Sequence, residues 1–213
     1  INSNLKIFQI LTLTRHSAKM LVMRALIIFL VLVFNLQFWT KADDISDFEI
    51  EGFRVNDSLL KHFTKEEIKK NTDKNALRNF NGKYSMSNFM SKIGDYDGIQ
   101  VVYETSDEEY IALSIAGGIF YNNFKDCLKK KKSISNEIQI LFKNAKDVLD
   151  KVTKMEADKS GKSIRNADMY FLNDGIVAVT CTDWSDKITK SFNWTDNLRV
   201  HIRTKRFNDE FNR

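Results

Sequence analysis

The feature that most constrains the fold is a pair of segments with the pattern of antiparallel β-hairpins. In the first, GIQVVYET and YIALSIAGGIFYN flank a polar turn at residues 106–109. In the second, MYFLNDGIVAVTCTDW contains Asn-Asp-Gly at 173–175, which is a strong turn signal. Hairpins join neighbouring antiparallel strands, whereas parallel sheets need strand–helix–strand units. The sequence therefore predicts an antiparallel sheet.

Two further segments complete the predicted sheet. KYSMSNFM at 83–90 is expected to pair with the first hairpin, in which we expect Ile111, Leu113 and Ile115 to share one face. NLRVHIRT at 197–204 has the period-two alternation of a last strand. Three of its apolar side chains are predicted to point inward and three polar ones outward: Leu198, Val200 and Ile202, against Arg199, His201 and Arg203. Solvent exposure is the ordinary explanation for His201 at such a position.

From Phe124 to Ala145 the apolar residues recur at steps of three and four, which predicts an amphipathic helix. The run Lys129–Lys132 is interpreted as the solvated side of this helix. A shorter helix is expected after Thr64, because Thr64 and Glu67 fit a capping box, and another around Phe207 and Phe211. The predicted fold class is α+β, an antiparallel sheet built from hairpins, with a long amphipathic helix and shorter helices packed on one face.

An apolar run near the N-terminus determines which residues fold together. The stretch MRALIIFLVLVFNLQFWTKADD at 23–44 is short for a stable membrane anchor, which takes roughly 20 apolar residues. Arg24 precedes it, and small residues end it at Thr40-Lys-Ala42. These features predict a signal peptide within residues 1–42, cut between Ala42 and Asp43, and a single domain at 43–213 that is periplasmic or secreted. The alternative is an uncleaved anchor in the inner membrane.

The net charge of +5 does not indicate a nucleic-acid partner. All of the excess lies in residues 1–42, which hold five basic residues and no acidic one, so 28 basic and 28 acidic residues balance in the rest of the chain. Binding to nucleic acid needs a basic surface that displaces counterions. We therefore expect no nucleic-acid partner, and membrane contact only if the leader is retained.

The chain has two cysteines, Cys127 and Cys181, and both are expected at the interface of helix and sheet. Cys127 lies on the apolar stripe of the predicted helix, and Cys181 shares a strand face with Val177 and Val179. In an oxidising compartment this arrangement predicts a structural disulfide, the alternative being two separately buried thiols.

Motifs of catalysis and cofactor binding are incomplete. ADKSGKS at 157–163 resembles a phosphate-binding loop, but Glu156 stands where that motif needs a glycine, and the segment precedes a strand. Only His62 and His201 follow the leader, with no zinc-ligand spacing and no support for a Ser-His-Asp arrangement. The sequence predicts no catalytic residue, no metal site and no cofactor.

The best candidate for a binding surface is the segment 182–199. It combines Trp184 and Trp194 with Asp186 and Arg199, a mixture of aromatic faces and polar groups that suits the rim of a binding site. The alternative is that both tryptophans close the end of the core.

Four stretches carry a resemblance to a known family: EIEGFRVNDSLLKHF, GGIFYNNFKDCLKKK, ADKSGKS and CTDWS…DNLRVHI. Together they resemble a family of uncharacterised small secreted proteins from AT-rich marine bacteria of the SAR11 type, over nearly the whole chain after Ala42. The resemblance implies an exported bacterial protein with two cysteines and implies no catalytic residues. The opening of this region is also similar to the outer-membrane assembly lipoprotein domain of the SmpA type, whose lipidated cysteine this chain lacks.

Three functional hypotheses follow. The first is an exported, non-catalytic accessory or binding module for a protein or small-molecule partner that the sequence does not identify. The second is a hydrolase that uses acids of the 182–199 segment and the 156–166 loop, which would require Asp183 or Asp186 to meet another acid in one cleft. The third is an interaction domain held at the inner membrane by an uncleaved N-terminal helix.

Overall fold

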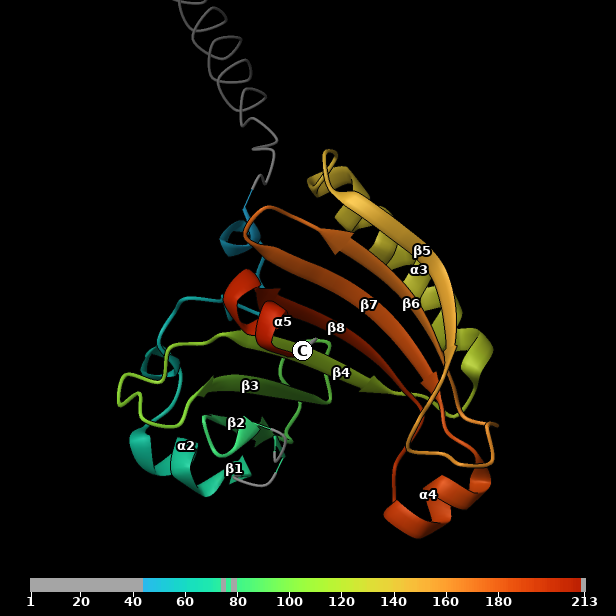
Figure 1. The fold of residues 1–213 in the computed structure, drawn as a ribbon, viewed down its shortest axis with the longest axis horizontal. Coiled ribbons are helices and arrows are strands. Elements are labelled where there is room, and N and C mark those ends of the chain that lie inside the picture. Colours follow the sequence, from blue (N-terminus) through green and yellow to red (C-terminus); the bar gives the residue numbers. More distant parts are fainter. Residues whose placement is uncertain (1–43, 74–75, 78–79, 212–213) are drawn as a thin grey trace, which may run out of the picture. The chain divides into compact units, whose positions relative to one another are not determined.

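Eight strands form one antiparallel sheet in the order β1-β2-β3-β4-β8-β7-β6-β5 (Figure 1). This computed structural model describes residues 44–73, 76–77 and 80–211, which belong to a compact unit at 41–213. The predicted signal peptide at 1–42 and its cut before Asp43 lie outside the described residues.

The strands divide into two meanders that meet where β4 pairs with β8. The strands are β1 (Thr72–Asp73), β2 (Tyr84–Phe89), β3 (Gly98–Glu104), β4 (Ser114–Phe120), β5 (Lys146–Lys154), β6 (Ile164–Phe171), β7 (Gly175–Asp183) and β8 (Asn197–Thr204). The helical elements are η1 (Ile45–Asp47), η2 (Leu59–Lys61), α2 (Lys65–Lys70), α3 (Phe124–Leu141), α4 (Asp186–Phe192) and α5 (Lys205–Phe211).

Local signals account for much of this arrangement. The predicted turn at 173–175 joins β6 to β7, and the Leu172 N–H donates to the Gly175 carbonyl oxygen at 2.9 Å. The predicted capping box is also confirmed: the Thr64 side chain accepts from the Glu67 N–H, and the Glu67 carboxylate accepts from the Thr64 N–H at 2.8 Å. Strand β2 pairs with β3, as expected for 83–90.

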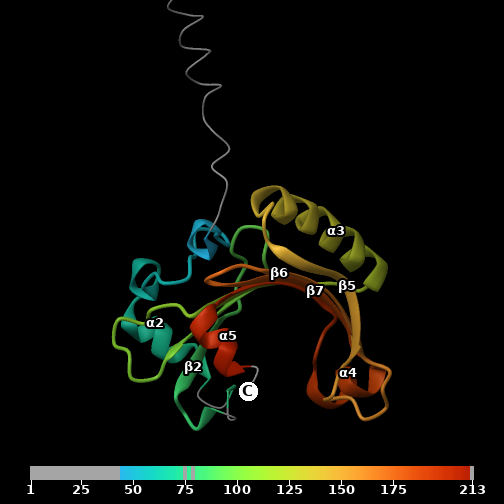
Figure 2. The ribbon, with the colours of Figure 1, turned by 45° about the horizontal axis from the view of Figure 1, so that its top comes forward.

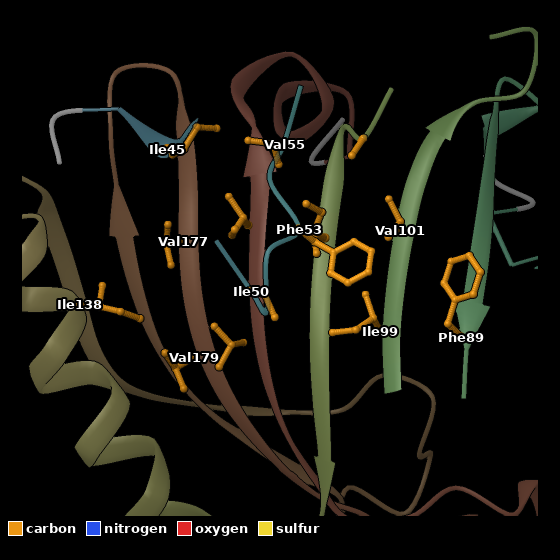
Figure 3. Close-up of a cluster of buried hydrophobic side chains, with 14 of the residues drawn as sticks. Ile45, Ile50, Phe53, Val55, Phe89, Ile99, Val101, Ile138, Val177 and Val179 are labelled. Atoms are coloured by element: carbon orange, nitrogen blue, oxygen red, sulfur yellow. The ribbon is translucent and has the colours of Figure 1, made fainter. Parts of the chain in front are cut away.

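The two faces of the sheet differ in what covers them. The convex face, which carries Val101, Ile115, Val177, Val179 and Val200, holds the main core. Figure 3 shows four side chains of the N-terminal segment over this face, those of Ile45, Ile50, Phe53 and Val55. Ile138 of α3 lies over the same face. The concave face carries Gln100, Ala116, Ala178 and His201, and α5 lies inside its curve whereas α3 lies outside (Figure 2).

The predicted fold class, with a long amphipathic helix and shorter helices on one face, is wrong. The eight-stranded antiparallel sheet dominates the chain, and the helices are few: α3 has 18 residues and packs mainly against β7, and α2, α4 and α5 have six or seven. The helices do not share a face either. Cys127 of α3 joins the convex core, whereas Phe207 of α5 packs with Tyr84 and Val102 on the concave side.

The first hairpin is less regular than expected. Strand β4 begins at Ser114, and Tyr110 before it has a positive φ of 52°. The chain also bends at Leu113, directly before this strand, so Leu113 lies outside its regular alternation. Leu113 and Ile115 accordingly lie in different hydrophobic clusters, and the expectation that they share a face is wrong.

The helix α3 ends at Leu141, before the predicted end at Ala145, and residues 146–154 form the edge strand β5, which was not predicted from the sequence. The pairing of β5 with β6 shifts between Val148 and Lys151, which is a β-bulge. Asp150 lies in the bulge with a positive φ of 49°. The sheet therefore ends on this side in an irregular strand.

Candidate functional site: the groove on the concave face

The concave face of the sheet forms an open groove of about 1120 Å³. Strands β2, β3, β4, β8, β7 and β6 contribute to its walls and floor, and Phe207 and Phe211 of α5 close one end. Because alternate residues of a strand point to the same face, every second residue of β8 from Asn197 to Arg203 points into the groove.

Short side chains beside β8 make the floor of this groove deep. The sheet register places four short residues beside Arg199 and His201: Gly118 and Thr180, and Ala116 and Ala178. Long side chains at these positions would fill the space above the sheet. The short side chains of β4 and β7 therefore contribute to the depth of the hollow.

Three guanidinium groups and one imidazole occupy this floor. Arg199, His201 and Arg203 alternate along β8, and Arg165 projects from β6 two strands away. None of the carboxylates in the described part of the chain forms an ion pair with these arginines. Asp73 is the one acidic residue among the described residues that line the groove. The floor thus carries positive charge that no ion pair with an acid of the described residues neutralises.

Burial and mutual repulsion lower the pKa values of these groups. Burial lowers the pKa of Arg199 to about 10, and the charge of Arg165 adds to the effect. Burial likewise lowers the pKa of Arg203 to about 10, with further contributions from Arg199 and Arg165. The pKa of His201 lies well below its ordinary value, first because of burial and then because of the three arginines. A bound anion would relieve this repulsion, since an opposite charge favours the protonated forms.

An amide pair extends the polar floor toward β2. The Gln100 Nε2 donates to Asn88 Oδ1 at 2.7 Å. The Gln100 Oε1 is buried and accepts no hydrogen bond within the described part of the chain. It is therefore an acceptor that a ligand could use beside the cationic floor.

Aromatic side chains lie at both ends of the groove. At one end the rings of Trp184 and Trp194 are 4.6 Å apart, centroid to centroid, and Phe192 lies 5.3 Å from Trp194. At the other end Phe211 stacks with Phe80 at 6.0 Å, and the Arg203 guanidinium lies 4.2 Å from the Phe211 centroid. The groove thus combines cations in its middle with aromatic surfaces at its ends.

The structure brings together three of the four residues that the sequence singled out for binding. Trp184, Trp194 and Arg199 all line the groove, and an Asp196 carboxylate oxygen accepts from the Trp184 N–H at 2.7 Å. Asp186 does not line it, because it is exposed in the first turn of α4.

Sequence reasoning missed Arg165, His201 and Arg203 as site residues. The outward direction of His201 and Arg203 was predicted, but β8 lies at the centre of a curved sheet, so that side faces a groove and both side chains are only partly exposed. The available signal was the pattern Arg-x-His-x-Arg, in which every second residue of one strand is an arginine or a histidine.

The acids proposed for hydrolysis lie elsewhere. Asp183 follows Cys181 in the alternation of β7, which directs it to the convex side, and it does not line the groove. Burial and the nearby Asp196 raise its pKa. In the 156–166 loop, Asp158 accepts from the Ser163 hydroxyl at 2.7 Å and from the Ser163 and Ser160 N–H groups at 2.9 Å each. Hydrogen bonds from Ser163, first, and from Ser160 lower the pKa of Asp158. Asp158 therefore stabilises a turn before β6.

One lysine of the run at 129–132 is buried, so its interpretation as wholly solvated is wrong. The Lys131 Nζ donates to Asp168 at 2.6 Å and to Asp150 at 2.9 Å. Burial would raise the pKa of Asp168, but hydrogen bonds from the Asp150 N–H, Lys131 and Ser135 lower it overall. This ion pair fixes α3 to β6 on the convex side.

The predicted disulfide between Cys127 and Cys181 is confirmed, and it joins α3 to β7. Both residues are fully buried in the convex core, on the opposite side of the sheet from the groove. The bond therefore holds the helix against the back of the groove floor.

Comparisons with known proteins do not extend this description: no family model matches the chain, and no curated protein or solved structure is significantly similar to it. Within residues 44–73, 76–77 and 80–211, no group of three or more His, Cys, Asp or Glu residues could hold a metal ion. The same residues contain no helix with the length and hydropathy needed to cross a bilayer.

Proposed function

We propose that this protein is a non-catalytic binding protein that holds an anionic small molecule in the groove of the concave face. One observation carries the proposal: Arg165, Arg199 and Arg203 line the groove together and form no ion pair with a described carboxylate. Unpaired guanidiniums on a partly buried floor are costly unless an anion joins them. Their planar fork of donors fits a carboxylate or a phosphate.

The groove's composition supports binding over hydrolysis. General acid–base catalysis needs positioned carboxylates or a base that titrates near the working pH. Asp73 is the lone acid among the described lining residues, and the pKa of His201 lies well below its ordinary value. The lining supplies cations, amides and rings, which bind and orient a ligand.

We further propose that the protein works outside the cytoplasm, in the periplasm or beyond. The disulfide of Cys127 and Cys181 is compatible with an oxidising compartment. The predicted leader at 1–42 supports export.

A charge-matched pair of ligands tests the binding proposal. Calorimetric titration should detect binding of hexyl phosphate and none of hexan-1-ol, because only the phosphate can pair with the guanidiniums. Arg199→Gln should weaken the binding of hexyl phosphate by about 1.5–3 kcal/mol, the usual strength of a hydrogen bond to a charged group. Lys187→Gln removes an exposed charge of α4 outside the groove and should leave the affinity unchanged.

Two results would contradict the proposal. One is equal affinity of the wild type and Arg199→Gln for hexyl phosphate, with both proteins folded. The other is equal binding of the alcohol and the phosphate.

A further inference from the structure

Large apolar side chains are exposed where the groove reaches Arg199. We call this group the apolar rim, and it consists of Met90, Phe120, Phe192 and Trp194, which are 61, 47, 58 and 40 % exposed. Isolated apolar residues are common on protein surfaces, but a group beside a polar hollow marks a binding site.

The apolar rim and the cationic floor are continuous. Met90 and Phe120 line a side hollow of about 190 Å³ together with Arg199. Trp194 lines the main groove with Arg199 and Arg165, and Phe192 lies against Trp194. A molecule whose charged group reached Arg199 would therefore leave the groove between apolar surfaces from β4 and from α4.

We propose that the ligand is a single-chain anionic amphiphile whose phosphate or carboxylate head binds Arg199 and Arg165 and whose hydrocarbon tail lies along the apolar rim. This inference rests on the proposed function, to which it adds the chemical class of the ligand. A head without a tail would leave four exposed apolar side chains without a role, and a tail without a charge would leave the guanidiniums unpaired.

The amphiphile binds as a detached molecule, and not as part of a membrane. Arg199 and His201 lie on the floor of a concave face and are only partly exposed. The headgroups of a bilayer form a broad, nearly flat surface, which meets the edges of a groove before its floor. One molecule outside a membrane can enter the groove head first.

Three ligands with the same head separate the contribution of the tail from that of the charge. Calorimetric titration with inorganic phosphate, hexyl phosphate and dodecyl phosphate, the two alkyl phosphates below their critical micelle concentrations, should give affinities that rise with chain length. Dodecyl phosphate should bind at least about tenfold more tightly than hexyl phosphate, since each buried methylene strengthens binding severalfold.

Variants of the apolar rim locate the tail. Phe192→Ser and Met90→Ser should each weaken dodecyl phosphate about tenfold and leave inorganic phosphate unchanged, because the removed side chains contact only the tail. Ile140→Ser is the matched control, since Ile140 is 48 % exposed on α3, on the other face of the sheet. Circular dichroism verifies that each variant is folded.

The outcomes separate this inference from the function on which it rests. Equal affinities for hexyl and dodecyl phosphate, or unchanged affinity of both rim variants for dodecyl phosphate, would overturn the amphiphile and leave the anion-binding function standing. Absence of binding to all three phosphates would overturn both. Tighter binding to vesicles that contain phosphatidic acid than to monomeric dodecyl phosphate would overturn the detached ligand.

Discussion

At the scale of single residues, the groove holds a histidine that should remain neutral in the folded protein. Its pKa is lowered by burial and by Arg203, Arg199 and Arg165 around it. The unfolded chain protonates this imidazole near its ordinary pKa of about 6.5. As the pH falls below that value the unfolded state binds more protons, so His201 lowers the free energy of unfolding in acid and not at neutral pH.

Urea unfolding of the wild type at pH 7.5 and 5.5 should therefore show a loss of stability that His201→Gln reduces. His62→Gln is the matched control, because it replaces an exposed histidine that lies outside the groove. Equal losses in the wild type and His201→Gln would show that the folded protein protonates His201 as readily as the unfolded chain does.

A second residue-scale prediction concerns the buried ion pair of Lys131 and Asp168, whose side chains are 3 and 6 % exposed. Lys131→Met leaves the Asp168 carboxylate buried without its cation, which should cost about 3–5 kcal/mol of unfolding free energy. The adjacent, exposed Lys130→Met should change it little. Lys131→Met/Asp168→Leu should recover most of the loss, and denaturant titration measures all three. If Lys131→Met is no less stable than Lys130→Met, the ion pair of Lys131 and Asp168 contributes little to stability.

At the scale of elements, the antiparallel sheet could be predicted because local signals specify hairpins. The Asn-Asp-Gly turn before β7, the alternation of β8 and the capping box of α2 each depend on a few consecutive residues. The disulfide was also predictable, since helical and strand periodicity place Cys127 and Cys181 on facing surfaces.

Other elements could not be predicted, because they depend on contacts between distant segments. Strand β5 alternates poorly, and its bulge is shaped by the Asp150 N–H that donates to Asp168 at 2.7 Å. The face on which α5 packs is set by Tyr84 and Val102, which precede it by about a hundred residues. Periodicity shows that an element is amphipathic and says nothing of which surface it will meet.

The residues of the groove could likewise be predicted only in part from the sequence. The sequence placed Trp184, Trp194 and Arg199 in one segment, so they could be proposed together. Arg165 joins them only because β6 and β8 flank β7, and the hollow exists only because the sheet curves over short residues of β4 and β7. Strand order and curvature are properties of the whole sheet, and one segment does not contain them.

At the scale of the whole molecule, the proposed export can be tested on the intact chain. When expressed with its leader in an export-competent bacterial host, the protein should begin at Asp43, as intact-mass measurement of the periplasmic fraction would show. Cys127 and Cys181 should resist alkylation until a reductant is added, because they form the disulfide. Ala42→Glu should block the cut, since signal peptidase reads a small residue there. Recovery of the wild type with its leader intact would favour the anchored alternative.

The two outer strands of the sheet, β1 and β5, affect whether copies of the protein can aggregate by pairing their strands. A flat outer strand invites a neighbour's backbone to pair with it, and repeated pairing leads to aggregates. Here one margin is only two residues long, and the other is offset by its bulge and carries Lys146, Lys151 and Lys154. Copies of this chain should therefore not join sheet to sheet through these two outer strands, even when the protein is concentrated.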